Sequence, residues 1–247
     1  MSAADPLHRV TGPRYGARGA ARNRAAVKTV LAVSIAAAAA LGLDGRANAK
    51  DGLHEGPRIV AIGDSLTAGY GLEQGTGFVP QLDAWLAEQG LPEAEVVDMG
   101  VSGDTTAGGR SRLAWALADG ADAVIVALGG NDLLRGILPE ASRENLATML
   151  TELDAQALPV LLAGMQAPLN YGPEYKEAFD AMYPELAAKY DAILHPSFLA
   201  GLEDRPELIQ PDGLHPNAEG VRVMVEAIGP RVLELIARVE PGAPAER

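Results

Sequence analysis

Short apolar runs alternate with longer amphipathic stretches from residue 58 onwards, and this alternation constrains the fold most strongly. The runs are rich in β-branched residues and lie at 59–62, 95–99, 123–128, 160–163 and, more weakly, 192–194. Runs that are apolar almost throughout indicate strands buried on both faces, which is typical of a parallel sheet.

The stretches between these runs place apolar residues three and four positions apart, as amphipathic helices do. They predict helices at 78–89, 105–118, 144–157, 174–190 and 217–239. Pro230 lies inside the last stretch and predicts a kink, or a split into two helices. Strands that alternate with helices in this way favour an α/β protein, a three-layer α/β/α sandwich.

The first 49 residues differ from the rest of the chain. A region rich in Arg and Lys (1–28) precedes an apolar run of 14 residues (30–43) and the sequence Ala-Asn-Ala (47–49). This order predicts a secretory signal peptide within 1–49 and an exported protein, periplasmic or secreted. The run is shorter than the about 20 residues of a permanent span, so no stable membrane span is expected after processing. An alanine-rich helix in an N-terminal extension is the alternative.

Charge and composition exclude several functions. Residues 1–49 carry seven Lys or Arg and two Asp or Glu, so the net charge of −13 for the whole chain becomes −18 for residues 50–247. An acidic surface repels phosphate backbones, which argues against a nucleic-acid partner. The chain has no cysteine, which excludes a thiol nucleophile, disulfides and thiolate metal sites.

Polar, glycine-rich loops follow the predicted strands. Three of them lie at 63–65 (GDS), 100–105 (GVSGDT) and 129–132 (GGND), and a fourth, at 211–217 (PDGLHPN), precedes the last predicted helix. In an open parallel sheet the loops after the strands meet at one edge, where sites form. We therefore expect the first three loops to be neighbours.

Ser65 in the first of these loops is a candidate nucleophile, which requires a base to remove its proton. The chain has four histidines, His8, His54, His195 and His215. His215 follows Asp212 by three residues, a spacing that lets the aspartate accept a hydrogen bond from the imidazole and fix its tautomer. His195 precedes a proline and is also consistent with a structural role.

Each loop has a simpler interpretation when it is taken alone. Asp64 and Ser65 are helix-capping residue types, so the first loop is also consistent with a turn and a cap. Asp212-Gly213 is consistent with a turn that leaves His215 on the surface, and 129–132 with a turn after a strand. The occurrence of all the loops in one chain favours a site.

The loops together resemble the SGNH, or GDSL, hydrolases. The resemblance is carried by GDSL at 63–66, Gly103, the G-x-N-D of 129–132 and the D-x-x-H of 212–215, in the order of that family. Further stretches, such as GDSLTAGYGL, VSGDTTAGGRSRL, LGGNDLLRG and DGLHPN, resemble its thioesterase I, lysophospholipase L1 and arylesterase branch. The family implies a flavodoxin-like fold with a central five-stranded parallel sheet.

The resemblance also implies roles for particular residues. Ser65 is expected to be the nucleophile, His215 the base and Asp212 the residue that orients it. The backbone N–H groups of Ser65 and Gly103 and the side chain of Asn131 are expected to form the oxyanion hole. Three leucines beside the motifs are candidates for substrate binding: Leu133, Leu134 and Leu214.

The sequence therefore predicts a serine hydrolase domain at 50–240, a signal peptide and extension at 1–49, and a disordered tail at 241–247. Its expected substrates are small esters, thioesters or lysophospholipids, and no metal or organic cofactor is implied. A carbohydrate acetylesterase and a binding protein without turnover are the alternatives. A nucleophile elbow of the α/β-hydrolase type is disfavoured, because residue 67, two after Ser65, is not glycine.

Overall fold

Five strands form one parallel sheet in the order β2-β1-β3-β4-β5 in the computed structural model of the chain, which describes residues 56–239. The predicted signal peptide at 1–49 and tail at 241–247 lie outside the described residues. The strands are β1 Arg58–Gly63, β2 Glu95–Gly100, β3 Ala123–Ala127, β4 Val160–Ala163 and β5 Ile193–His195. The prediction of a parallel sheet is confirmed.

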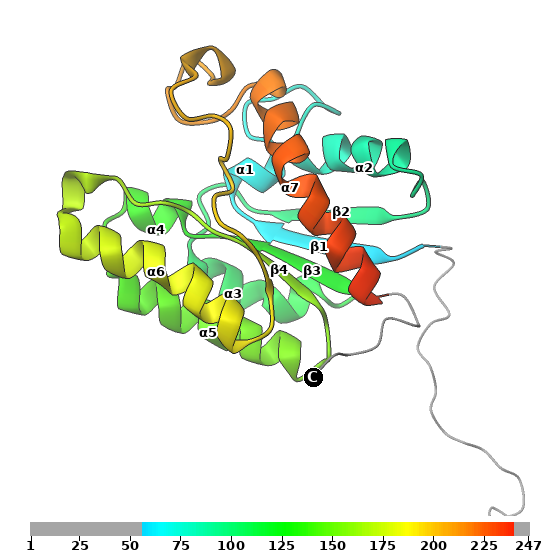
Figure 1. Cartoon of the computed structure of the whole chain (residues 1–247), viewed down its shortest axis with the longest axis horizontal. Coiled ribbons are helices and arrows are strands. Elements are labelled where there is room, and N and C mark those ends of the chain that lie inside the picture. The colour runs from blue at the N-terminus through cyan, green and yellow to red at the C-terminus, as the bar shows by residue number, and fades with distance from the viewer. Residues whose placement is uncertain (1–55, 240–247) are drawn as a thin grey trace, which may run out of the picture. The chain divides into compact units, whose positions relative to one another are not determined.

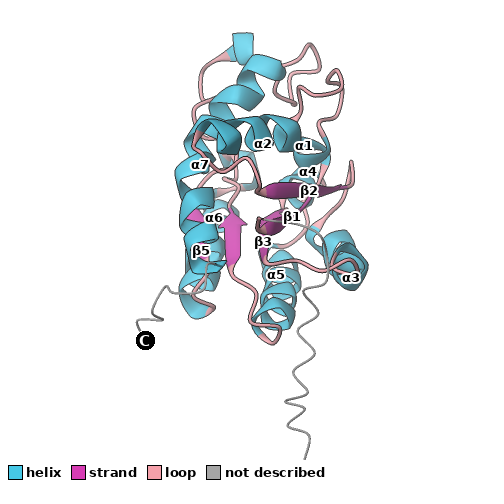
Figure 2. Cartoon of the chain, turned by 90° about the vertical axis from the view of Figure 1, so that its right-hand side faces the viewer, coloured by secondary structure: helices cyan, strands magenta, loops and turns pink. Residues whose placement is uncertain are grey.

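Helices cover both faces of this sheet. Helices α2 and α7 pack on one side of the strands, and α3, α5 and α6 pack on the other (Figure 1). Figure 2 shows α3 and α5 opposite α2 and α7. Their bounds are α2 Phe78–Glu88, α3 Thr106–Ala116, α5 Pro139–Asp154, α6 Pro173–Lys189 and α7 Ala218–Val239. The α/β/α sandwich predicted from the alternation is thus the observed architecture.

Alternate residues of each central strand enter two separate hydrophobic cores. Ile59 and Ala61 of β1 pack towards α2 and α7, whereas Val60 and Ile62 pack towards α3, α5 and α6. Successive side chains of a strand point to opposite faces, so a strand covered on both sides must be apolar at every position. All five residues of β3 are buried for this reason.

Helix α7 runs unbroken through Pro230, so the split, one of the two outcomes predicted for this proline, is wrong. Pro230 and Glu226, whose carbonyl loses its helical partner, both lie on the exposed face, where water can hydrate that carbonyl. Ile228 and Val232 on the opposite face are fully buried in the core. Packing on that face outweighs the local cost of the proline.

Four short elements connect the strands and helices, and the sequence pattern did not predict them. They are α1 Ser65–Ala68, α4 Gly130–Leu134 and the 3₁₀ turns η1 Leu169–Tyr171 and η2 Pro206–Leu208. Helix α5 also begins at Pro139, before the predicted start at 144. Proline suits the first turn of a helix, where its missing N–H costs no hydrogen bond.

None of the helices within residues 56–239 has the length and apolarity that a membrane span requires. The predicted domain at 50–240 contains all of the described residues.

Candidate active site

Strand β1 lies between β2 and β3 in the sheet, so the loops after these three strands share one edge. The loop after β1 begins with Asp64 and leads directly into α1, whose first residue is Ser65. Asp64 caps this helix, because its Oδ1 accepts a 3.0 Å hydrogen bond from the N–H of Leu66. Gly69 ends the helix with φ +70°, a conformation that favours glycine. The cap and the placement of Ser65 at a strand end are therefore both present.

Ser65 and His215 come together although 150 positions separate them in the chain. Nε2 of His215 lies 2.9 Å from Oγ of Ser65, and Nδ1 lies 2.7 Å from Oδ2 of Asp212. An imidazole that donates from Nδ1 to a carboxylate presents an unprotonated Nε2 to the serine hydroxyl. The predicted serine, histidine and aspartate thus form one continuous hydrogen-bonded series.

Asp212 also accepts hydrogen bonds from its own loop. Its Oδ1 accepts from the N–H of His215 at 3.0 Å and from the N–H of Leu214 at 2.9 Å. These two backbone groups, followed by the His215 side chain, lower the pKa of Asp212 from 3.8 to about 2. Asp212 therefore stays ionised at any pH at which His215 acts as a base.

Two residues of neighbouring loops hold the His215 loop in place. The amide nitrogen of Gln210 donates to the carbonyls of Tyr70 and Pro216, at 2.9 Å each. The ring of Tyr70 lies 4.8 Å from the His215 ring, tilted by 42°. Gln210 thereby ties the segment after α1 to the segment that carries His215. No sequence pattern predicts this contact, because a single glutamine in a loop belongs to no motif.

Asn131 lies in α4, after β3, and reaches the loop of Ser65. Its Nδ2 donates a 3.2 Å hydrogen bond to Oδ2 of Asp64, so each oxygen of that carboxyl group accepts one N–H. Asp64 is only 3% exposed, and burial raises its pKa from 3.8 to about 6. One carboxyl group thus fixes both the start of α1 and the orientation of the Asn131 amide.

The neighbouring Asp132 fixes α4 itself. Its fully buried carboxylate accepts hydrogen bonds from the N–H and Oγ1 of Thr106, at 2.9 and 2.6 Å, and from Oγ of Ser142 at 2.8 Å. Buried polar groups are stable when such partners satisfy them. Asp132 therefore joins α4 to the starts of α3 and α5.

Gly103 lies in the loop after β2 with φ +83°, where a side chain would be strained. Its carbonyl accepts a 2.5 Å hydrogen bond from Nη2 of Arg135, the residue that ends α4. The described residues that line the pocket beside Ser65 and His215 do not include Gly103.

A pocket of about 270 Å³ opens beside Ser65 and His215. The three leucines predicted for substrate binding, Leu133, Leu134 and Leu214, all line it. Leu133 is buried, whereas Leu134 and Leu214 are exposed at the mouth. Further lining residues were not predicted to bind substrate: Leu66, Met165, Gln166, Pro168, Asn170, Tyr171 and Leu199. Most of the exposed area of this lining is apolar, as is typical of pockets that bind small molecules.

His195 ends β5 and is buried in the fold. Burial lowers its pKa, and its Nε2 has no hydrogen-bond partner among the described residues. It does not line the pocket described above. These features agree with the structural role that the sequence left open for His195. Within the described part of the chain, no group of three or more His, Asp or Glu side chains is arranged to hold a metal ion.

An α/β/α sandwich that presents Ser65, His215 and Asp212 in hydrogen-bonded order at the carboxyl edge of its sheet has the site of a serine hydrolase. The family model of the GDSL-like lipases and acylhydrolases matches residues 61–223. The chain belongs to this family.

Several named enzymes, and proteins of solved structure, are similar to this chain. Esterase TesA of Pseudomonas aeruginosa is 40% identical over 179 residues, which cover 72% of this chain and 89% of that protein. The thioesterase 1/protease 1/lysophospholipase L1 of Escherichia coli K12 is 37% identical over 163 residues, covering 65% of this chain and 76% of that protein. The crystal structure of AlinE4, an SGNH-hydrolase family esterase, is 46% identical with a TM-score of 0.63, covering 74% of this chain and 98% of that one.

The family and these relatives confirm the predicted class. The protein is an enzyme, a hydrolase of ester or thioester bonds with the SGNH fold. The alternative of a binding protein without turnover is therefore set aside.

Proposed function

We propose that the enzyme cleaves carboxylic esters or thioesters through an acyl-enzyme on Ser65. The observation that carries the proposal is the 2.9 Å contact between His215 Nε2 and Ser65 Oγ, with the 2.7 Å contact to Asp212 behind it. His215 takes the hydroxyl proton as Oγ attacks the acyl carbon, and then gives that proton to the departing alcohol or thiol. Water, activated by His215 in turn, attacks the acyl-enzyme and releases the acid.

The negative charge on the acyl oxygen requires donors that are already in place. We assign this role to the N–H groups of Ser65 and Gly103 and to Nδ2 of Asn131. The support is that Asn131 lines the same pocket as Ser65 and is oriented by Asp64. Gly103 lies on the neighbouring loop after β2.

The apolar pocket supports aryl esters, acyl-CoA thioesters and lysophospholipids as the substrate class, with Leu133, Leu134 and Leu214 in contact with the acyl part. A carbohydrate acetylesterase would need polar groups for a sugar, and away from Ser65 the lining offers Gln166, Asn170 and Tyr171 among mostly apolar side chains. The mechanism uses only side chains and backbone groups of this chain.

The activity is tested by comparing kcat/KM across aryl esters, acyl-CoAs and a lysophospholipid of matched chain length, with Ser65→Ala as the control. We expect activity on acyl chains of several carbons and its loss in Ser65→Ala. Activity confined to acetyl esters and acetylated glycans would instead indicate the acetylesterase alternative. Turnover that persists in Ser65→Ala would reject the nucleophile assignment.

We also propose that residues 1–49 direct export and are removed after Ala49, which leaves the hydrolase domain and a disordered tail at 241–247. The support is the order of basic region, apolar run and Ala-Asn-Ala in the sequence. Expression of the full chain in a Gram-negative host, followed by N-terminal sequencing of the periplasmic form, tests this. A first residue of Lys50 is expected, and unprocessed chains in the cytoplasm would contradict it.

A further inference from the structure

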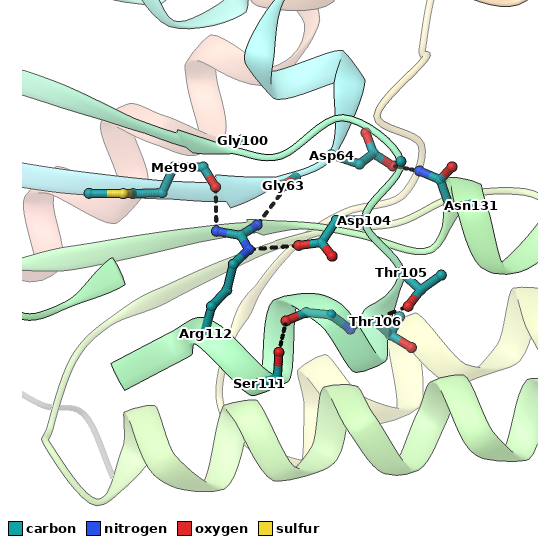
Figure 3. A network of polar contacts seen from close by, with 12 residues as sticks. Gly63, Asp64, Met99, Gly100, Asp104, Thr105, Thr106, Ser111, Arg112 and Asn131 are labelled. Atoms are coloured by element: carbon teal, nitrogen blue, oxygen red, sulfur yellow. Dashed lines mark hydrogen bonds and ion pairs between the residues drawn. The ribbon is translucent and has the colours of Figure 1, made fainter. Parts of the chain in front are cut away.

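Arg112 joins the two loops that carry the proposed nucleophile and the proposed Gly103 donor, without lining the pocket itself. It lies on α3, and its guanidinium group donates three hydrogen bonds to three different residues (Figure 3). Nη2 donates to the carbonyl of Gly63 at 2.9 Å, Nη1 to the carbonyl of Met99 at 2.8 Å, and Nε to Oδ2 of Asp104 at 2.6 Å.

The positions of these three acceptors in the chain show which segments the guanidinium group of Arg112 connects. Gly63 is the last residue of β1 and lies two positions before Ser65. Met99 lies near the end of β2, and Asp104 directly follows Gly103. One planar group therefore holds the end of each strand and the loop between β2 and α3 at fixed separations.

The residues around the guanidinium group of Arg112 restrict its movement. The side chains of Arg112 and Asp104 are 15% and 14% exposed, so solvent screens the ion pair weakly. Oδ1 of Asp104 occupies the space beside Gly108 in which a Cβ would lie, only 1.7 Å from such an atom. The carbonyl of Gly63 accepts a second bond from the N–H of Val101, which adds to the connection between the two loops.

The third proposed donor is linked to the same network. Asn131 contacts Asp64 (Figure 3). In the sequence, Asp64 lies between Gly63 and Ser65. A series of contacts therefore runs from Asp104 through Arg112 and Gly63 to Asp64 and Asn131. The residues beside all three proposed oxyanion-hole groups belong to it.

We propose that Arg112 is a positioning residue for the oxyanion hole, a role that rests on the function proposed above. An oxyanion hole stabilises the transition state only when its donors lie about 2.7–3.1 Å from the developing charge. A displacement of about 1 Å can reduce the rate on the order of 100-fold. Arg112 sets the distance between Ser65 and Gly103, so its loss lowers transition-state stabilisation more than substrate binding.

Lysine is the informative replacement. Its single ammonium group keeps the positive charge beside Asp104 but cannot reach three acceptors that are arranged around a planar fork. Arg110 offers a matched control, since it lies on the same helix and its described hydrogen bond is to Asn145 on α5. Asp104→Asn is a second variant, which keeps the shape of the acceptor and removes its charge.

The experiment measures kcat and KM for an aryl ester with the full exported protein, at a temperature where thermal melting shows each variant folded. Active sites are titrated with a fluorophosphonate, so that kcat is expressed per reactive serine and a misfolded fraction does not lower it. Inhibition by an alkyl boronic acid, which forms a tetrahedral adduct on serine, reports the oxyanion hole independently.

We expect Arg112→Lys to lower kcat per titrated site by about 10- to 100-fold, with KM changed less than about threefold. The affinity for the boronic acid should fall by a similar factor, and Arg110→Lys should behave as the unaltered enzyme. If Arg112→Lys does not fold, Asp104→Asn carries the same expectation with a smaller loss.

A kcat per titrated site within about twofold of the unaltered enzyme in the folded variants would overturn the proposal, as would an unchanged boronate affinity. A different result is expected if the proposed hydrolase function itself is wrong. An unaltered enzyme that turns over no ester and reacts with no fluorophosphonate would reject the assignment of Ser65, and the positioning role would fall with it.

Discussion

The side chain of Asn131 donates a hydrogen bond from Nδ2 to Asp64, and it lines the pocket beside Ser65. Asn131→Ala removes a side-chain donor while leaving Ser65, His215 and Asp212 in place. We expect kcat to fall on the order of 100- to 1,000-fold, because such a donor acts mainly on the transition state. Steady-state kinetics on an aryl ester measure this, and an unchanged kcat would remove Asn131 from the oxyanion hole.

The buried carboxyl group of Asp64 should make the stability of the fold depend on pH. Burial raises its pKa from 3.8 to about 6, so between these values the folded chain holds a proton that the unfolded chain has lost. The contribution of Asp64 to the free energy of unfolding therefore falls as pH rises through this window, by up to about 3 kcal/mol. Asp64→Asn has no carboxyl group to titrate and should lose this fall.

Urea unfolding at several pH values between 4 and 7 measures the effect. The free-energy difference between Asp64→Asn and the unaltered protein should shift in favour of the variant as pH rises. Asp154→Asn, at an exposed position at the end of α5, is the control. Parallel curves for Asp64→Asn and the unaltered protein would contradict the assigned pKa.

Helix α7 contains a glycine whose replacement should act against the usual trend. Alanine normally stabilises a helix interior relative to glycine by about 1 kcal/mol. At Gly229, however, a Cβ would lie 2.6 Å from the ring of Trp85 on α2. We expect Gly229→Ala to lower the free energy of unfolding by about 1–3 kcal/mol through overpacking.

A double-mutant cycle separates these two effects. In a Trp85→Leu background the ring is gone, so Gly229→Ala should become neutral or stabilising. Chemical denaturation of the four proteins measures the coupling. Equal effects of Gly229→Ala in both backgrounds would show that contact with Trp85 does not limit the approach of α7 to α2.

The elements differ in how far the sequence predicts them. The strands were predictable because burial on two faces requires apolar residues at every position, as in β3. Helices α1 and α4 were not, because four or five residues are too few to show a helical period. The split at Pro230 was wrong because a local rule yielded to packing by Ile228 and Val232.

The residues of the site also divide into those that the sequence predicts and those that it does not. Ser65, Asp212 and His215 were predictable because each lies in a short motif of residue types that the chemistry needs, and the structure brings them together. Arg112 and Gln210 were not, because most of their partners are backbone carbonyls, which every residue type carries.

At the scale of the whole molecule, charge predicts a salt effect. The chain carries a net charge of −13, or −18 without residues 1–49, and acyl-CoA is also an anion. Repulsion slows their association and weakens as salt screens it. We expect kcat/KM for an acyl-CoA to rise on the order of threefold or more between low and physiological ionic strength.

A neutral aryl ester of the same acyl length is the control and should show little change. Parallel salt titrations of kcat/KM for the two substrates provide the measurement. A fall for the acyl-CoA with added salt would show that a local positive region, rather than the net charge, governs its approach.

The separation of 150 positions between Ser65 and His215 has a consequence for the newly made chain. Ribosomes build proteins from the N-terminus, so the serine emerges long before its base exists. Until the segment with His215 has folded against α1, the hydroxyl remains as unreactive as that of free serine. A chain that is still being synthesised therefore cannot yet hydrolyse the thioesters of the cell that makes it.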